Sequence, residues 1–282
     1  MKTSILISTF NNLEYLKFTI NSILNNSKYN HQILIHINEG SDGSLNFIRE
    51  LNLEYSYSNK NIGLCSAINL LTKYIKSNYV LYSHDDMYFC KNWDLYLEEE
   101  ISKYKNNYFY LTGTNISVDK GLINYSCGDS PKNFDKLKFE KFCNNDNSSD
   151  LQGSHWAPHV VHKHLWDSVG GFSEEFNPGD GSDPDFCMKL WIKGVRIFKT
   201  ISKFKVYHFS SVTTRKRDII LNNGTRTFLL KYGFNPRFFR KYYLKGNNSK
   251  PFDGPLNNPK FSINMFYDYL INKLKFIYFK IL

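Results

Sequence analysis

In the first 90 residues, short segments with the hydrophobic pattern of a strand alternate with segments whose hydrophobic residues have the spacing of a helix. Apolar runs typical of buried parallel strands lie at residues 4–8, 33–37, 53–57 and 79–83. Between them, apolar residues spaced by three or four positions predict helices over residues 13–24, 45–51 and 63–76, the first capped by Asn11 or Asn12. Strands that alternate with helices over short connections indicate an α/β fold with a mostly parallel sheet flanked by helices.

The later part of the chain has a less regular pattern. Residues 113–155 are rich in Asn, Ser and Asp and are expected to form a long surface excursion. Asp183 before Pro184 is typical of a helix start, with Asp183 as the N-cap, and apolar runs at 195–198 and 205–209 predict two strands. The expected parts are a domain of residues 1–212, with halves 1–112 and 113–212, and a helical region of residues 213–282.

Charge is distributed unevenly along this chain of 282 residues, whose formal net charge is +10. Residues 199–282 contain 17 Lys and Arg against three Asp and Glu, so this segment carries +14 and the rest of the chain carries −4. A protein that is basic throughout and binds nucleic acid is therefore disfavoured, and nucleic acid is not an expected partner.

The five cysteines form no CxxC pair and are odd in number, which favours reduced thiols in a cytoplasmic setting. The N-terminal apolar run is too short for a signal peptide, and no stretch reaches the roughly 18–20 apolar residues of a membrane span. We expect a cytoplasmic protein, either free or held peripherally at a membrane surface.

Polar clusters follow three of the predicted strands, at residues 8–11, 38–42 and 84–86. Ligand sites of parallel sheets lie beyond the carboxyl ends of the strands, so these clusters are expected to converge on one edge. The chain contains neither GxGxxG nor GxxxxGK[ST], which disfavours a classical dinucleotide fold and a P-loop.

Seven segments occur in an order that resembles the family 2 glycosyltransferases of the GT-A fold. They are ILISTFNN, INEGSDGS, NKNIGLCSAIN, YSHDDM, GGFSEEF, SDPDFCMKLWIKG and VYHF. The chain departs from the family pattern at Asn38-Glu39, where the family has a carboxylate-rich turn, and at Ser182-Asp183, where Glu-Asp is usual. It lacks the QxxRW motif of processive synthases, which favours transfer of a single sugar. The resemblance implies a nucleotide-sugar-binding first half and an acceptor-binding, catalytic second half.

Asp85 and Asp86 form the strongest chemical feature of the sequence. A nucleotide-sugar loses a diphosphate, and hard carboxylate oxygens suit the Mn²⁺ or Mg²⁺ that stabilises such a leaving group. The resemblance implies that Asp86 ligates this metal, that His208 completes its shell, and that Asp85 contacts the ribose or sugar or holds the metal through water. The alternatives are a solvated turn for the two carboxylates and a structural role for His208.

Further residues around these motifs are expected to bind the donor. Phe10 could stack on the base, Glu39 could accept a hydrogen bond from a base N–H, and Gly63 begins a helix whose free N–H groups suit phosphate or ribose. The alternatives are a core aromatic for Phe10, a turn acid for Glu39, a helix-start glycine for Gly63 and an ordinary turn for Gly170 and Gly171. The base of a UDP-, GDP- or dTDP-linked donor stays open. The expected donor-binding residues are Ser8, Thr9, Phe10, Asn11, Glu39, Asn61, Gly63, Asn69, Asp85, Gly170 and Gly171.

Asp183 is the candidate general base, because displacement at an anomeric carbon needs the acceptor hydroxyl to lose its proton as it attacks. Its competing role is that of the helix N-cap, and Asp185 is the second candidate base. His155 and Trp156 are candidates for an acceptor platform, since aromatic faces stack on sugar C–H surfaces, and the alternative for Trp156 is a place in the core.

The C-terminal region has two features. Dense bases interleaved with aromatics lie around 215–217 and 226–241. After them an apolar helical stripe, with Lys273, Lys275 and Lys280 beside it, comprises Ile263, Phe266, Tyr267, Leu270, Leu274, Ile277 and Ile281. Such a helix can lie on an anionic membrane, and the alternatives are packing on the main domain or on a second subunit.

These observations predict an inverting, metal-dependent glycosyltransferase of polysaccharide biosynthesis. It would move one sugar from a nucleotide-sugar to a glycan or lipid-linked acceptor. The first alternative is a nucleotidyltransferase acting on sugar phosphates, which the missing Gly-rich phosphate loop disfavours. The second is a non-catalytic membrane or nucleic-acid adaptor on the same scaffold, which the intact carboxylates disfavour.

Overall fold

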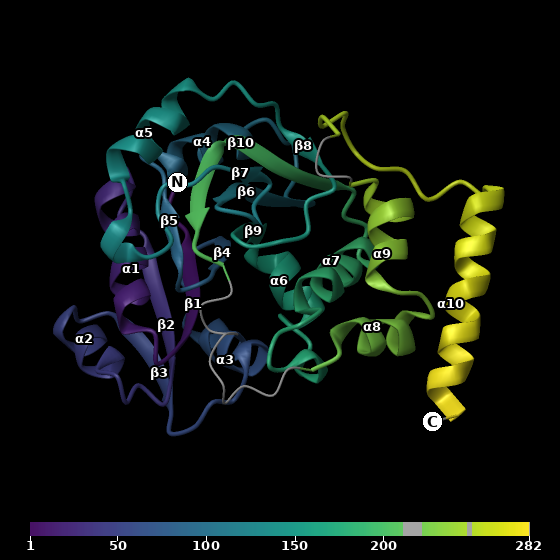
Figure 1. Ribbon diagram of the computed structural model, residues 1–282, viewed down its shortest axis with the longest axis horizontal. Coiled ribbons are helices and arrows are strands. Elements are labelled where there is room, and N and C mark those ends of the chain that lie inside the picture. The colour runs from purple at the N-terminus through teal and green to yellow at the C-terminus, as the bar shows by residue number, and fades with distance from the viewer. Residues whose placement is uncertain (211–221, 247–249, 282) are drawn as a thin grey trace.

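The protein, seen in a computed structural model that describes residues 1–210, 222–246 and 250–281, is built on one ten-stranded sheet (Figure 1). The strand order is β3-β2-β1-β4-β9-β6-β10-β5, with β7 beside β6 and β8 beside β10. The strands are β1 (Ser4–Phe10), β2 (Gln32–Asn38), β3 (Glu54–Ser58), β4 (Tyr79–Ser83), β5 (Met87–Phe89), β6 (Phe109–Ser117), β7 (Ile123–Asn124), β8 (Leu151–Gln152), β9 (His159–His162) and β10 (Ile197–His208).

Helices pack on this sheet and extend beyond it. The α-helices are α1 (Leu13–Asn26), α2 (Ser44–Glu50), α3 (Leu64–Leu71), α4 (Trp93–Ile101), α5 (Lys136–Asn145), α6 (Lys163–Val169), α7 (Ser182–Ile192), α8 (Gly224–Tyr232), α9 (Pro236–Phe238) and α10 (Ile263–Ile281). Single turns of 3₁₀-helix lie at η1 (Thr72–Tyr74), η2 (Pro131–Asn133) and η3 (Glu174–Phe176), and η4 (Phe239–Leu244) is a π-helical segment.

The order of the strands places a ligand site between β1 and β4. The chain steps from β1 to β2 and β3 in one direction along the sheet and then crosses back to β4 on the other side of β1. Right-handed crossovers therefore put α1 and α2 on one face and α3 on the other. The crevice at such a reversal, beyond the carboxyl ends of the strands, is where ligands bind in α/β sheets.

The first four predicted strands and the parallel pairing among them are confirmed. The sheet as a whole is mixed, because β9 and β5 run antiparallel to their neighbours. The predicted surface excursion at 113–155 is wrong for its first residues, since β6 is a buried central strand that continues to Ser117. The two strands predicted at 195–198 and 205–209 are one strand, β10, with an irregularity between Ile201 and Lys205.

The start of α1 shows a capping device that the local sequence did not reveal. Asn12 occupies the N-cap position, as predicted, but its side chain makes no capping hydrogen bond. The carboxylate of Asp42 accepts instead from the Leu13 N–H at 2.6 Å. A carboxylate at a helix N-terminus satisfies an orphan donor and opposes the helix dipole, and here it joins the turn after β2 to the helix after β1.

The C-terminal helices form a separate layer at the right of Figure 1, beyond α7. Buried aromatics such as Phe228 on α8 and Phe239 on η4 pack this layer against the rest of the core. The predicted domain boundary at residue 212 and the basic residues 215–217 lie outside the described residues. Within the described ranges, no helix combines the length and the apolar character needed to cross a bilayer.

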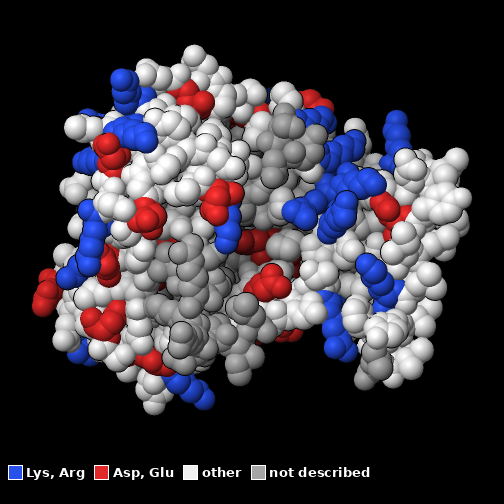
Figure 2. All heavy atoms as spheres, in the orientation of Figure 1, with Lys and Arg blue, Asp and Glu red and all other residues white. Residues whose placement is uncertain are grey.

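Charge follows the same division. Figure 2 shows basic side chains gathered on the C-terminal layer, with acidic side chains in the hollow beside it. Four of the bases, Arg237, Arg240, Lys241 and Lys245, line one shallow pocket of 390 Å³. The uneven charge of the sequence thus corresponds to two distinct surfaces of the folded chain.

Candidate functional site

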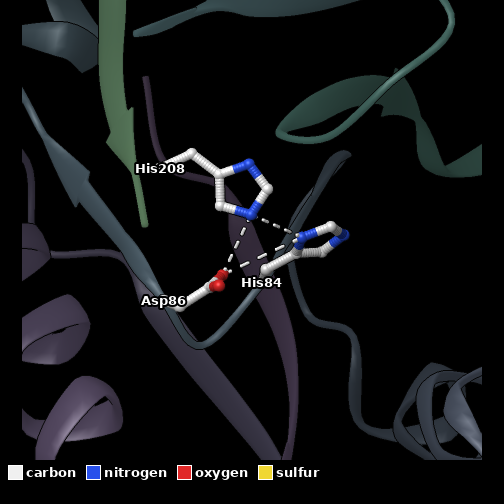
Figure 3. A group of neighbouring side chains, drawn as sticks. All are labelled: His84, Asp86 and His208. Atoms are coloured by element: carbon white, nitrogen blue, oxygen red, sulfur yellow. Dashed lines mark hydrogen bonds and ion pairs between the residues drawn. The ribbon is translucent and has the colours of Figure 1, made fainter. Parts of the chain in front are cut away.

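Three side chains meet at the carboxyl end of β4, where the strand order reverses (Figure 3). The Nε2 atom of His208, the last residue of β10, lies 3.1 Å from Oδ1 of Asp86 and 3.3 Å from Nδ1 of His84. His84 Nδ1 lies 4.0 Å from the same carboxylate oxygen. One ligand atom from each residue falls within 4.8 Å of the others, so the cluster could hold one ion.

Buried hydrogen bonds hold this turn in place. Thr19, buried on α1, donates its hydroxyl to the Asp85 carbonyl at 2.8 Å and accepts from the Met87 N–H at 3.0 Å. The N–H of Phe209 donates to the Asp86 carbonyl at 3.1 Å, which fastens the end of β10 to the turn. Because both backbone segments are fastened, the side chains of Asp86 and His208 are positioned before any ligand arrives.

The electrostatics of the cluster prepare Asp86 and His84 for ligation, whereas Asp86 and other carboxylates outweigh burial and raise the pKa of His208, which would have to give up a proton to bind a metal. Burial works to raise the pKa of Asp86, but His208, His84 and a backbone hydrogen bond together outweigh burial, so the pKa of the carboxyl is lowered overall. Burial, with the charge of His208, lowers the pKa of His84 to about 4, so its imidazole is neutral near pH 7. A carboxylate and a neutral imidazole are the protonation states that metal ligation requires.

The chemistry of the donor set fits a divalent cation. One carboxylate oxygen and two imidazole nitrogens suit Mn²⁺, which accepts both kinds of ligand, better than Mg²⁺, which prefers oxygen. Asp85, next to the cluster, is buried as well. The predicted metal residues Asp86 and His208 thus lie together in the structure, and metal binding itself stays a prediction.

Asp183 faces the same region from the start of α7. Its Oδ1 atom is buried and has no hydrogen-bond partner within the described residues. Burial raises the pKa of Asp183 to about 7, although the charge of His208 acts in the opposite direction. A carboxylate with a pKa near 7 and a free acceptor oxygen is suited to take a proton from a hydroxyl.

The competing capping role of Asp183 is wrong in this structure. Helix α7 begins at Ser182, and Gly181, in the left-handed conformation with φ of 85°, occupies the N-cap position. Asp183 is therefore the second residue of the first turn, and it makes no side-chain capping bond. Its negative charge still gains from the positive end of the helix dipole.

Asp185, the second candidate base, is a structural anion instead. It is fully buried and accepts from Ser173 Oγ at 2.6 Å and Tyr232 Oη at 2.7 Å, while Lys231 Nζ lies 2.9 Å away. These contacts join α7 to α8 and occupy both carboxylate oxygens. Asp183 therefore stays the candidate general base, and that role remains a prediction.

Replacing Asp185 with Ala is expected to destabilise the fold by about 3 kcal/mol, because the Ser173 and Tyr232 hydroxyls lose their acceptor and Lys231 keeps only Glu175 as an ionic partner. Denaturant unfolding measures this free energy. Asp167→Asn, which alters only a partly exposed pair with Lys163, is the matched control and should cost less than ~1 kcal/mol. An equally small cost for Asp185→Ala would contradict the structural role.

The residues predicted to bind the base lie together at the ends of β1 and β2. Asn11 donates its amide to a Glu39 carboxylate oxygen at 3.1 Å and accepts from the Ser41 N–H at 2.9 Å. Asn38 donates to Ser8 Oγ at 3.2 Å. Phe10 ends β1 beside them and is half-buried, so the edge offers an aromatic ring next to polar groups. Base binding here remains a prediction.

The helix N-terminus predicted to bind phosphate is already capped by the protein. Asn177 Oδ1 accepts from the Cys65 N–H at 2.9 Å, and the Leu64 N–H donates to the Pro178 carbonyl at 3.0 Å. Gly63 is required there because a Cβ would lie 2.4 Å from the Asn177 side chain. The expectation of free N–H groups at the start of α3 is therefore wrong, and Asn61 is likewise engaged, accepting from the Gly63 N–H.

Asn69 fastens the turn that contains Gly170 and Gly171 through two hydrogen bonds. The Asn69 amide donates to the Phe172 carbonyl at 2.8 Å and accepts from the Phe172 N–H at 2.9 Å. A Cβ on Gly171 would lie 2.4 Å from Asn69 Oδ1, and Gly170 closes α6 with φ of 69°. These contacts support the ordinary turn that was the alternative for this pair, with Asn69 holding the turn in place.

A pocket of 330 Å³ opens beside Asp183. His155 lines it with Arg240, whose guanidinium lies 3.5 Å from His155 Nε2. Burial lowers the pKa of His155 to about 4, so this imidazole is neutral. Trp156 is half-buried and donates its Nε1–H to the Gly113 carbonyl, with its ring edge-on to His155. Of the predicted acceptor pair, His155 lines the pocket and Trp156 supports it.

The sequence interpretation missed two residues of this region. His84 stands two positions before Asp86, and that spacing around a strand end was the available signal. Asn177 had no local signal, because it acts on Cys65 and Ser66, more than 110 residues earlier in the chain.

Solved structures similar to this fold are glycosyltransferases. A crystal structure of S. aureus TarS residues 1–349 matches with a TM-score of 0.57 and 16% identity, over 75% of this chain and 61% of TarS. GalNAc-T7 with UDP, GalNAc and Mn²⁺ matches with a TM-score of 0.56 and 16% identity, over 74% of this chain and 44% of that one. TarS with UDP-GlcNAc matches with a TM-score of 0.55 and 17% identity over the same shares as the first. This chain thus spans about three fifths or less of these proteins.

Comparison with curated proteins finds no match. The model of glycosyl transferase family 2 matches residues 4–157, which is more than half of the chain and includes β1 to β6 with the His84–Asp86 turn. The predicted GT-A architecture agrees with the similar structures. The protein belongs to glycosyl transferase family 2.

Proposed function

We propose that the protein is a metal-dependent glycosyltransferase that moves a single sugar from a nucleotide-sugar to a glycan or lipid-linked acceptor, with inversion. The observation that carries the proposal is the half-buried carboxylate of Asp183, which lines a pocket, has a buried Oδ1 atom without a hydrogen-bond partner among the described residues, and interacts electrostatically with His208 of the His84–Asp86–His208 cluster. One group could take a proton while the other holds the charge of a departing diphosphate.

In this mechanism each residue has one task. Asp86, His84 and His208 would hold Mn²⁺ or Mg²⁺, which when bound supplies positive charge against a leaving nucleoside diphosphate. Asp183 takes the proton of the acceptor hydroxyl as that oxygen attacks the anomeric carbon. Attack and departure on opposite sides of one carbon invert its configuration, and the unpaired Oδ1 of Asp183 gives the proton a place to go.

The donor is proposed to be UDP-linked. Structures of similar fold hold UDP or UDP-GlcNAc, and this supports a uridine nucleotide at the edge formed by β1 and β2. Asn11 and Glu39 offer amide and carboxylate groups that could pair with the N–H and carbonyl groups of a uracil. The acceptor is proposed to enter the pocket between Asp183 and Arg240.

A thermal-shift screen tests the proposal. UDP, GDP, dTDP and their sugar conjugates are tested with and without Mn²⁺ on the full chain, since a ligand that binds only the folded state raises Tm. We expect a shift with UDP that grows with Mn²⁺ and falls again with chelator. No shift with any nucleotide would contradict nucleotide-sugar binding, and release of pyrophosphate during turnover would favour the nucleotidyltransferase alternative.

A further inference from the structure

Helix α10 exposes an unbroken apolar stripe on the outer side of the molecule. At about 100° per residue, nine apolar residues share an arc of about 140° that contains no polar residue. Each is between 41% and 80% exposed, and the stripe runs the ~28 Å length of the helix. Its members are Ile263, Phe266, Tyr267, Leu270, Ile271, Leu274, Ile277, Tyr278 and Ile281.

The opposite side of α10 is the one that packs on the protein. Asn272 is buried, accepts from the Asn235 N–H at 2.9 Å and donates to the Asp268 carbonyl at 2.7 Å. Asp268 pairs with Lys241 at 2.7 Å and accepts from Tyr242 Oη at 2.7 Å. Polar contacts on the inner face orient the helix, so the apolar stripe faces away from α8. Helix α10 itself stands at the right edge of the molecule in Figure 1.

Lysines border the stripe on both sides. Lys273 and Lys280 follow one edge of the arc and Lys275 follows the other, so positive charge flanks an apolar surface. Asp268 is the single acidic residue of α10, and it is occupied by Lys241. A helix that lies in a membrane interface has this pattern, since its apolar face enters the acyl boundary while lysines reach anionic headgroups.

We infer that α10 binds the surface of an anionic membrane. A second copy of the chain fits less well, because pairing two stripes would bring the lysine borders of both copies together with no free acid on the helix to oppose them. Helix α10 does not combine the length and the apolar character that a membrane-crossing helix needs. The inference does not depend on the proposed glycosyl transfer, since membrane binding needs no substrate.

Helix α10 is connected through α8 to the pocket proposed to bind the acceptor. Helix α10 packs on α8, and Thr225 of α8 lines the pocket that also contains Asp183 and Arg240. Binding through α10 would hold the chain at the membrane, with α8 between the membrane-facing stripe and that pocket. An acceptor carried on a lipid would then be at the same membrane surface as the protein.

Flotation of the full chain with vesicles tests the inference. We expect binding to phosphatidylcholine vesicles that contain phosphatidylglycerol, weaker binding at high salt, and little binding to phosphatidylcholine alone. The double variant Leu274→Gln with Ile277→Gln should lose binding, and replacing the three bordering lysines with Gln should weaken it at least tenfold. Leu137→Gln, which changes an exposed apolar residue on α5, is the matched control and should bind like the wild type.

Two results would overturn the inference. One is absence of binding to the anionic vesicles at low salt, or equal binding by the double variant. The other is a wild-type dimer in sedimentation that the double variant abolishes, without vesicle binding by either, which would assign the stripe to a second copy. The substituted side chains are exposed except that of Lys273, which is half-buried over the rings of Tyr269 and Phe276, so the Tm of each variant is measured beside its vesicle binding and the double variant is expected to keep the wild-type Tm.

Discussion

Asp86→Asn is expected to lower turnover of the nucleotide-sugar about a thousandfold, a loss of ~4 kcal/mol of transition-state stabilisation. Asp86 contributes the single carboxylate of the His84–Asp86–His208 cluster, and its charge opposes that of any cation held there. An amide of the same size keeps the packing but loses that charge. Steady-state release of UDP from a UDP-sugar, with Mn²⁺ present, measures the effect.

Folding must be shown to survive this substitution. Asp86 is buried next to His208, whose pKa is raised overall because Asp86 and other carboxylates outweigh the effect of burial. A Tm within a few degrees of the wild-type value would assign the loss of turnover to the site. Asp167→Asn, which removes a carboxylate from a surface pair, is the control for charge alone and should keep full activity. Wild-type turnover by Asp86→Asn would remove Asp86 from the mechanism.

Asp183→Asn is expected to reduce transfer by 10²–10⁴-fold, as for the loss of a general base, while affinity for UDP stays unchanged. An asparagine cannot accept the proton of the acceptor hydroxyl. Comparison of UDP binding by calorimetry with the rate of transfer separates the two properties. Weakened UDP binding with an unchanged transfer rate would place Asp183 in the donor site instead.

The pH dependence gives a second test of the same residue. Because burial raises the pKa of Asp183 to about 7, activity of the wild type should rise as pH increases through about 7, where the carboxyl becomes charged. Stability changes with pH in the opposite direction from activity. The folded chain holds this proton more tightly than the unfolded chain, so folding loses stability between pH 4 and 7 as the pH rises, and Asp183→Asn should remove part of that loss.

The outline of the sheet was predictable because its first strands are continuous apolar runs between helices with regular spacing. Strand β6 escaped prediction because its core positions include Thr112 and Thr114, which satisfy their hydroxyls across the sheet. Thr112 Oγ1 lies 3.0 Å from Thr200 Oγ1, and Thr114 donates to the Ile201 carbonyl at 2.9 Å. A buried polar residue with a distant partner looks like a loop residue in sequence alone.

The candidate site was predictable where the residues themselves carry the chemistry. Asp86 and Asp183 were identified because both are carboxylates in segments that follow the order of the family motifs. In the structure, His208 contacts Asp86 and acts electrostatically on Asp183. The α3 N-terminus was not predictable, because its donors are satisfied by Asn177 from a remote segment. Sequence could identify a helix start but not which groups would reach it.

The C-terminal helix shows a similar limit. Its apolar stripe is visible in the sequence, and the expectation that it packs on the main domain was one of three alternatives. In α10 both sides carry aromatic residues, and the inner side is distinguished by Asn272 and Asp268, whose bonds go to the segments around α9. Polar side chains with partners, more than hydrophobicity, decided which side faces inward.

Anomalous scattering at the manganese edge, from crystals of the full chain grown with UDP and Mn²⁺, tests most directly whether the His84–Asp86–His208 cluster holds the metal. We expect one strong peak bound by the Asp86 carboxylate with His208 or His84, and a diphosphate next to it. A nucleotide bound at another surface, or a peak with no ligand from the His84–Asp86–His208 cluster, would contradict it.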